Sequence, residues 1–169
     1  MNLQQNWQQL MDFHGWPENH KTRDKLLKAY AGRSRHYHNQ THLSVCLQWV
    51  VQYQDEIDEP DALQLAFWFH DAIYNIFSKK NEIRSAAWAK DFALAQGADI
   101  QLAHLLHSLI LDTIHGRSDI VADNAWMVDI DLAVLGASEE IYAQYSKAVR
   151  KEYRLIPASI YKQGRSQLL

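Results

Sequence analysis

Cysteine, glycine and proline are scarce in this chain, and each shortage narrows its fold class. Cys46 is the single cysteine among 169 residues, so no intramolecular disulfide can form and a cysteine-ligated metal site is not expected. The six glycines and three prolines lie mostly between periodic segments. Asn-Gly and Asp-Gly turns between alternating β-branched runs, which would indicate hairpins, are missing. The sequence therefore predicts an all-helical protein.

The chain also lacks a surplus of positive charge, a long apolar run and a leader pattern. Its net charge is −3, with acids and bases interspersed, which argues against general nucleic-acid binding and against binding to anionic membranes. No apolar run approaches the length of a bilayer span, and the first residues lack the basic-then-apolar order of a signal peptide. We therefore expect a cytoplasmic protein.

What the chain does contain is enough apolar and aromatic material for one core. It is 47% hydrophobic, with six tryptophans and eight tyrosines, and its length fits one domain over residues 1–169. Breaks and capping residues predict a bundle of about eight or nine helices. The expected helices cover about 3–13, 20–31 and 41–54, one from Pro60 that carries "QLAFWFHDAIYN", one ending at Gly97, one from Asp99 to about Gly116, about 121–135, one from Ser138 and one from Pro157.

Two costly polar residues follow the apolar Phe67-Trp68-Phe69 run. Helical spacing places His70 and Asp71 on the face that also carries Leu63, Ala66, Phe67 and Tyr74. A buried carboxylate needs a cation or hydrogen-bond donors. His42 lies on the apolar stripe of its own helix, and either Asp129 or Asp131 could face inward from a third. Nitrogen and oxygen ligands without sulfur favour Mn, Fe, Co, Ni, Zn or Mg over a structural zinc site.

The order of these residues resembles the HD-domain superfamily of metal-dependent phosphohydrolases. That family uses a His, a His-Asp pair and a distant Asp on helices of an α-bundle. The segments "RHYHNQTHL", "FWFHDAIYN", "NEIRSA", "DIDLAVLG" and "VRKEYRLIPASIYKQGR" are similar to motifs of a bacterial subgroup of predicted phosphohydrolases. Two features depart from relatives: no Gly-Lys follows His70-Asp71, and family members continue further, so the C-terminus is expected to be shorter than theirs.

The resemblance implies a metal-dependent phosphohydrolase that uses metal-activated water on a small phosphorylated molecule, with a nucleotide as the expected substrate. The implied metal ligands are His42, His70, Asp71 and Asp131, with Asp129 as the alternative to Asp131. His115 is either a ligand of a second metal or a cation at a helix C-terminus. Asp71 and Glu82 are the candidate catalytic residues, and the candidates for binding substrate phosphate are Arg35, His38 and Arg84.

Two other functions stay open at this point. One is a non-catalytic module that binds a nucleotide or another phosphorylated molecule. The other is a di-iron oxygenase of the HD type, which needs more histidine ligands. A homodimer formed through aromatic residues of the terminal helices is also open.

Overall fold

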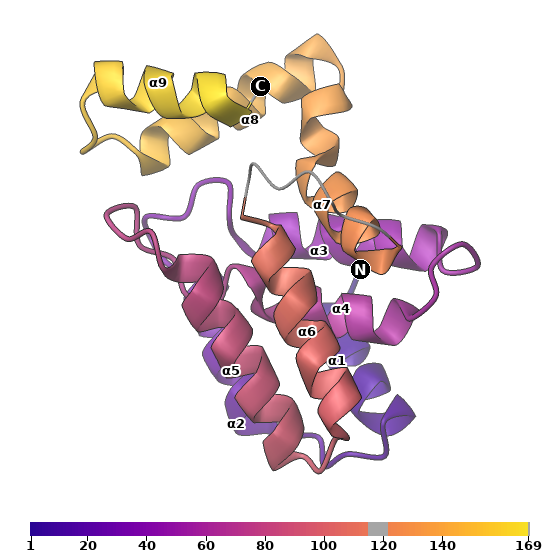
Figure 1. The fold of residues 1–169 in the computed structure, drawn as a ribbon. Helices are drawn as coiled ribbons and strands as arrows, with labels where there is room; N and C mark the ends of the chain where they lie inside the picture. The colour runs from indigo at the N-terminus through magenta and orange to yellow at the C-terminus, as the bar shows by residue number, and fades with distance from the viewer. Residues whose placement is uncertain (115–121, 169) are drawn as a thin grey trace.

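The computed structural model describes residues 1–114 and 122–168, and in these ranges the chain is helical without strands (Figure 1). This confirms the predicted all-α fold. The helices are α1 (Leu3–Phe13), α2 (His20–Tyr30), α3 (Gln40–Gln52), α4 (Pro60–His70), α5 (Asn81–Ala95), α6 (Ile100–Asp112), α7 (Asp123–Leu132), the 3₁₀-helix η1 (Ala133–Gly136), α8 (Glu139–Glu152) and α9 (Ala158–Leu168). In the described residues no helix is long and apolar enough to cross a membrane.

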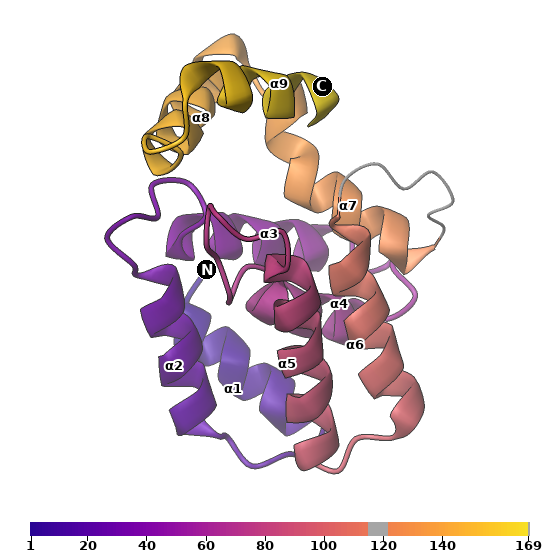
Figure 2. The ribbon, with the colours of Figure 1, turned by 60° about the vertical axis from the view of Figure 1, so that its left-hand side comes forward.

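Helix α4 is the centre of the bundle. It packs against α3, α5 and α6, with α1 and α7 in smaller contacts, while α5 and α6 lie side by side (Figures 1 and 2). Helices α8 and α9, here called the α8–α9 hairpin (residues 139–168), lie at one end of the molecule, reached through α7 and η1. The N-terminal half of α3 and the loop before it therefore lie between the core and this hairpin.

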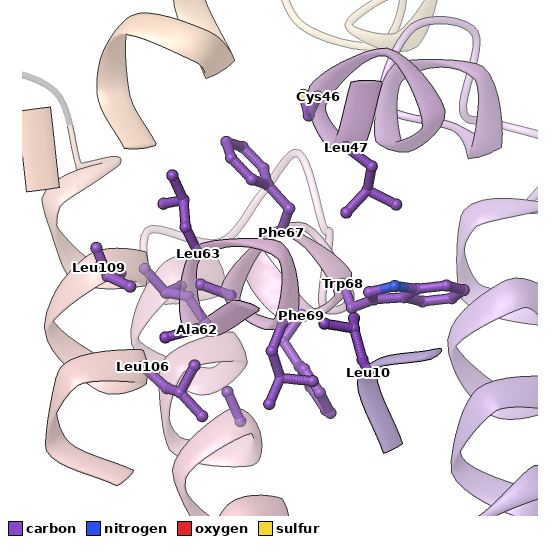
Figure 3. Packing of buried hydrophobic residues seen from close by; sticks show 14 of the residues in the cluster. Leu10, Cys46, Leu47, Ala62, Leu63, Phe67, Trp68, Phe69, Leu106 and Leu109 are labelled. Carbon is purple, nitrogen blue, oxygen red and sulfur yellow. The ribbon is translucent and has the colours of Figure 1, made fainter. Parts of the chain in front are cut away.

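The apolar run of α4 is buried on all sides. Phe67, Trp68 and Phe69 are fully buried, and Figure 3 shows them pointing in three different directions into the core. Successive helical side chains are about 100° apart, so three consecutive aromatic residues are buried only in a helix surrounded by others. This run fixes α4, and with it the position of the polar residues at its end.

Replacing Trp68 with alanine should cost about 3–5 kcal/mol of unfolding free energy. The indole packs edge-on against Trp7, with 5.0 Å between ring centroids, and its Nε1–H donates to Asn6 Oδ1 at 2.9 Å. Urea unfolding of the wild type and Trp68→Ala measures the loss. Phe13→Ala is the matched control, because Phe13 is 70% exposed and its removal should change stability by about 0.5 kcal/mol or less. Equal losses in both variants would contradict the central place of α4.

Several predicted helix ends are confirmed. Asp99 caps α6 by accepting a hydrogen bond from the Leu102 N–H at 2.7 Å, and Pro60 occupies the first turn of α4. Gly97 has a φ of +86°, the left-handed conformation expected of a glycine just beyond a helix.

Helix α4 has no side-chain cap of its own. Instead, the buried Asp123 at the start of α7 accepts the N–H groups of residues 58 and 59, which ties α7 to α4.

The predicted extent of α4 is wrong at its C-terminal end. The helix ends at His70, so Asp71 is its C-cap and Tyr74 lies in the turn that follows, rather than on one continued helical face. The reason lies in the carbonyl oxygen of Phe67, which accepts hydrogen bonds from the His70 ring and from the Tyr30 hydroxyl. The Asp71 N–H donates to that same hydroxyl at 3.2 Å. Tertiary contacts thus stop the helix and turn Asp71 out of it.

Candidate metal centre

Three helices bring two histidines and one aspartate together. His42 Nε2 from α3 lies 3.1 Å from Asp131 Oδ1 of α7 and 3.3 Å from His70 Nε2 of α4, and His70 Nε2 lies 3.7 Å from the same Asp131 oxygen. Donor atoms bound to one ion at about 2.1 Å are themselves about 3.0–3.5 Å apart. The spacing and the burial of this group therefore fit a single divalent cation.

Asp71 lies next to this group with an unsatisfied oxygen. Its Oδ2 atom is buried and makes no hydrogen bond, and it lies 3.4 Å from His70 Nε2. A buried carboxylate oxygen that accepts no hydrogen bond is unfavourable, and a cation beside it would remove that cost. This orphaned oxygen is an independent sign that the residues fit a metal ion.

A backbone hydrogen bond determines which nitrogen of the His70 ring carries a proton. Its Nδ1 lies 2.7 Å from the carbonyl oxygen of Phe67, which can only accept, so Nδ1 carries a proton. Nε2 is then the nitrogen whose lone pair is available to the centre, the arrangement usual for metal-binding histidines.

Tyr30 holds the segment that carries both His70 and Asp71. Its buried hydroxyl donates to the Phe67 carbonyl and accepts the Asp71 N–H, so one side chain positions both residues of the His-Asp pair.

Tyr30→Phe should weaken metal binding about 10–100-fold, the usual effect of losing a partner that orients ligands. The substitution removes one hydroxyl and leaves the ring, so we expect a stability loss of only about 1–2 kcal/mol. Titration with Mn²⁺ or Ni²⁺ by calorimetry measures the affinity, and urea unfolding measures the stability. Tyr53→Phe is the control, because Tyr53 ends α3 away from the centre and stacks on Trp49. An unchanged affinity in Tyr30→Phe would show that the hydroxyl does not position the ligands.

The charges around the centre also favour a cation. Burial lowers the pKa of His70, but the carboxylates of Asp71 and Asp131 outweigh it and raise this pKa to about 9. Burial raises the pKa of Asp131, yet its bonds to His42 and His70 hold it well below its ordinary value. The two carboxylates thus favour a positive charge at the centre, which either a proton on His70 or a bound metal ion would supply.

A residue that the sequence interpretation missed, Glu152 of α8, lies beside the centre with its side chain fully buried. Its Oε1 accepts the backbone N–H groups of residues 36, 37 and 38 at 2.7–3.0 Å. Its Oε2 lies 2.6 Å from His38 Nδ1 and accepts the Tyr74 hydroxyl at 2.7 Å. Glu152 lies in the motif "VRKEYRL", which the sequence analysis singled out. Its partners are distant in sequence, so the sequence alone did not indicate its role.

The pair of His38 and Glu152 is ionic. Burial alone would raise the pKa of Glu152, but the hydrogen bond and charge of His38, with the Tyr37 N–H and the Tyr74 hydroxyl, lower it to about 2. Burial lowers the pKa of His38, while the charge of Asp71 and the bond to Glu152 raise it above its ordinary value. Both shifts favour the charged form of the pair, in which the His38 Nδ1–H donates to the Glu152 carboxylate.

Arg35 holds the loop that carries His38. Its guanidinium donates to the carbonyl oxygens of His38 at 3.0 Å and Ala72 at 3.3 Å, and it lies between the rings of Tyr30 and Tyr74. These contacts join the loop before α3 to the turn after α4, the two segments that flank the centre. The contacts are structural, and a role of Arg35 in binding substrate stays a prediction.

Among the described residues, the other predicted site residues are not part of the cluster. Asp129 is exposed on α7, whereas Asp131 faces His42. Glu82 is half-buried in the first turn of α5. Arg84 is exposed on α5. His115 lies outside the described residues.

The chain was compared with models of protein families, with curated proteins and with solved structures. No family model, curated protein or solved structure matches it. The likeness to the HD-domain superfamily therefore stays a prediction, and any functional assignment rests on the residues of the centre.

Proposed function

We propose that the protein is a metal-dependent phosphohydrolase that hydrolyses a small phosphorylated molecule, with a nucleotide as the expected substrate. The observation that carries this proposal is the convergence of His42, His70 and Asp131 from three helices beside the orphaned oxygen of Asp71. The resemblance in motif order supports the same conclusion. These four residues would hold the ion. A bound divalent ion would supply Lewis acidity, lowering the pKa of a water molecule and polarising a phosphoryl oxygen.

Asp71 is suited to orient the attacking water. Its carboxylate lies at the edge of the cluster, partly open to solvent, and one oxygen has no hydrogen-bond donor of its own. A carboxylate in this state accepts a proton from water as the oxygen of that water attacks phosphorus. The Tyr30 hydroxyl holds the backbone of Asp71 in place, which keeps this carboxylate beside the ligands.

His38 is suited to protonate the leaving oxygen. Its Nδ1–H is committed to Glu152, so Nε2 carries the proton that can be transferred. His38 and Asp131 line the same pocket, so a substrate bound there would lie beside both residues. The bond from phosphorus to the leaving oxygen breaks as this proton is delivered, and the buried Glu152 stabilises the charged form of His38 beforehand. We prefer His38 over Glu82 as the acid because His38 lines this pocket with Asp131 and Glu82 does not.

Metal analysis and a hydrolysis screen test the proposal together. The full chain, loaded in turn with Mn²⁺, Ni²⁺ and Co²⁺ and then desalted, should retain about one ion per chain. It should release inorganic phosphate, or a monoester from a diester, from members of a panel of nucleotides and sugar phosphates, and EDTA should stop the release. Retained metal without hydrolysis of any panel member would favour a non-catalytic binding module. Bound iron with consumption of dioxygen would favour an oxygenase.

A further inference from the structure

We propose that a tyrosine-lined pocket under the α8–α9 hairpin binds the heteroaromatic base of the substrate, so that the enzyme prefers nucleotides to sugar phosphates. This inference rests on the proposed function, because it assumes that the phosphate lies at the metal centre. The pocket has a volume of about 370 Å³ and lies between the loop before α3, α7 and the hairpin. Asp131 and His38 are among the residues that line it, so the pocket reaches the edge of the centre.

Four tyrosines from separate segments line this pocket. Tyr37 comes from the loop before α3, Tyr145 from α8, Tyr153 from the turn after α8, and Tyr161 from α9. Apolar side chains such as Leu132 and Ile156 complete the walls. Tyr37 and Tyr145 meet edge to face, with 4.6 Å between ring centroids, so the aromatic rings of separate segments gather in one place. Stacking on aromatic side chains suits any base, because every base has a π-face.

Gly164 leaves part of this pocket open, because it has no side chain. It lies inside α9, where glycine is less favourable than alanine, and its φ is not in the left-handed region. A Cβ built at Gly164 meets no atom within 4 Å, so packing of the protein does not require glycine there. Yet Gly164 lines the pocket. The missing side chain leaves space beside the tyrosines for a ligand ring.

Arg165 adds a cation to the lining of the pocket. Its guanidinium lies over the ring of Tyr145 and donates to the hydroxyl of that residue at 2.6 Å. It also donates to the Tyr142 hydroxyl at 3.3 Å, so it holds α9 against α8. The pocket thus combines Asp131 of the centre, aromatic walls and a cation. A base between the tyrosines, with its phosphate beside Asp131, fits this lining.

Binding of AMP, CMP and ribose 5-phosphate to the full chain loaded with Mn²⁺ tests the inference, with phosphate release followed in the same samples. Calorimetric titration should show AMP and CMP binding about tenfold more tightly than ribose 5-phosphate, or better, because only the nucleotides carry a base that stacks. Gly164→Phe should reduce this preference to less than about twofold by filling the pocket. Gln163→Phe should keep it, since Gln163 is exposed, precedes Gly164 on α9 and does not line the pocket.

Folding and hydrolysis assays separate the remaining outcomes. Gly164→Ala should raise the urea unfolding midpoint; a lower midpoint would mean that the fold itself needs glycine and would overturn the argument. Equal binding of AMP, CMP and ribose 5-phosphate to the wild type, or no binding of any, would also overturn it. If the metal-loaded protein hydrolyses no ester while the base preference persists, the proposed function fails and the pocket assignment stands.

Discussion

Asp131→Ala is expected to abolish metal binding and hydrolysis, while Asp129→Ala leaves both unchanged. The two aspartates are two residues apart on α7, but Asp131 Oδ1 lies within 3.7 Å of both histidine Nε2 atoms and Asp129 is exposed. Losing a direct ligand should weaken metal binding by more than about 100-fold, beyond the usual effect of an outer partner. Hydrolysis should fall about 1,000-fold or more, because the ion supplies several kcal/mol of transition-state stabilisation.

The comparison uses metal content after desalting and the initial rate of phosphate release. Asp131→Asn is a second variant that keeps the shape of the side chain and removes its charge, so it reports on the same site if the alanine variant is poorly folded. Far-UV circular dichroism should be the same for all three variants. Full metal content in Asp131→Ala, or a loss in Asp129→Ala, would show that the centre is assigned to the wrong residue.

Glu152→Gln is expected to loosen the α8–α9 hairpin and to remove the acid function of His38. Holding the pKa of Glu152 at about 2 instead of 4.5 corresponds to about 3 kcal/mol of stabilisation. The glutamine keeps the shape but cannot hold the charged imidazole of His38. Hydrolysis should fall about 100-fold or more, as is typical when a general acid is lost. Tyr74→Phe is a milder control, since it removes one neutral hydrogen bond to Glu152.

The stability difference should also depend on pH, with a defined sign. The pKa of Glu152 is depressed in the folded state, so its stabilisation is complete above the unfolded value of 4.5 and is lost as the pH falls toward 2. The gap in unfolding free energy between wild type and Glu152→Gln should therefore be constant from pH 7 to 5 and fall to about half near pH 3. A gap that stays unchanged down to pH 3 would mean that the carboxylate is not the stabilising group.

Hydrogen exchange can locate the effect of Glu152→Gln. Helices α5 and α6 pack on α4 in the core, whereas α8 reaches the bundle mainly through η1 and the contacts of Glu152 and Tyr145. Exchange should therefore rise in residues 36–38 and 139–168 and stay low in α5 and α6. Uniformly faster exchange in all helices would contradict a local role.

Much of this protein could be predicted from local sequence. Helix-breaking residues, caps and the scarcity of β-turn signals predict the all-helical fold, because these effects act within a few residues. The inward position of His42 and His70 follows from helical spacing on apolar faces, and both are buried. The choice between Asp129 and Asp131 was open, since both lie within one turn and the rotation of α7 depends on its neighbours.

Other features depend on tertiary structure alone. The sequence predicts that α4 continues past Asp71, but the Tyr30 hydroxyl, from a helix 40 residues away, takes part in ending it. His38 was predicted only to bind substrate, and its partner Glu152 lies 114 residues further along the chain. Arg35 was expected to bind phosphate, yet its guanidinium is bonded to two carbonyl oxygens of the loops.

The sequence by itself determined most of the helices, the apolar faces and the polar residue types that those faces carry. It did so because helix formation and amphipathic spacing are local properties of a chain. Only the tertiary structure decided which carboxylates lie beside the two histidines and which residue raises the pKa of His38. It also decided where the tyrosines of four segments line a pocket. These features depend on contacts between residues that are distant in sequence, and such contacts arise only when the packed core fixes the helices relative to one another.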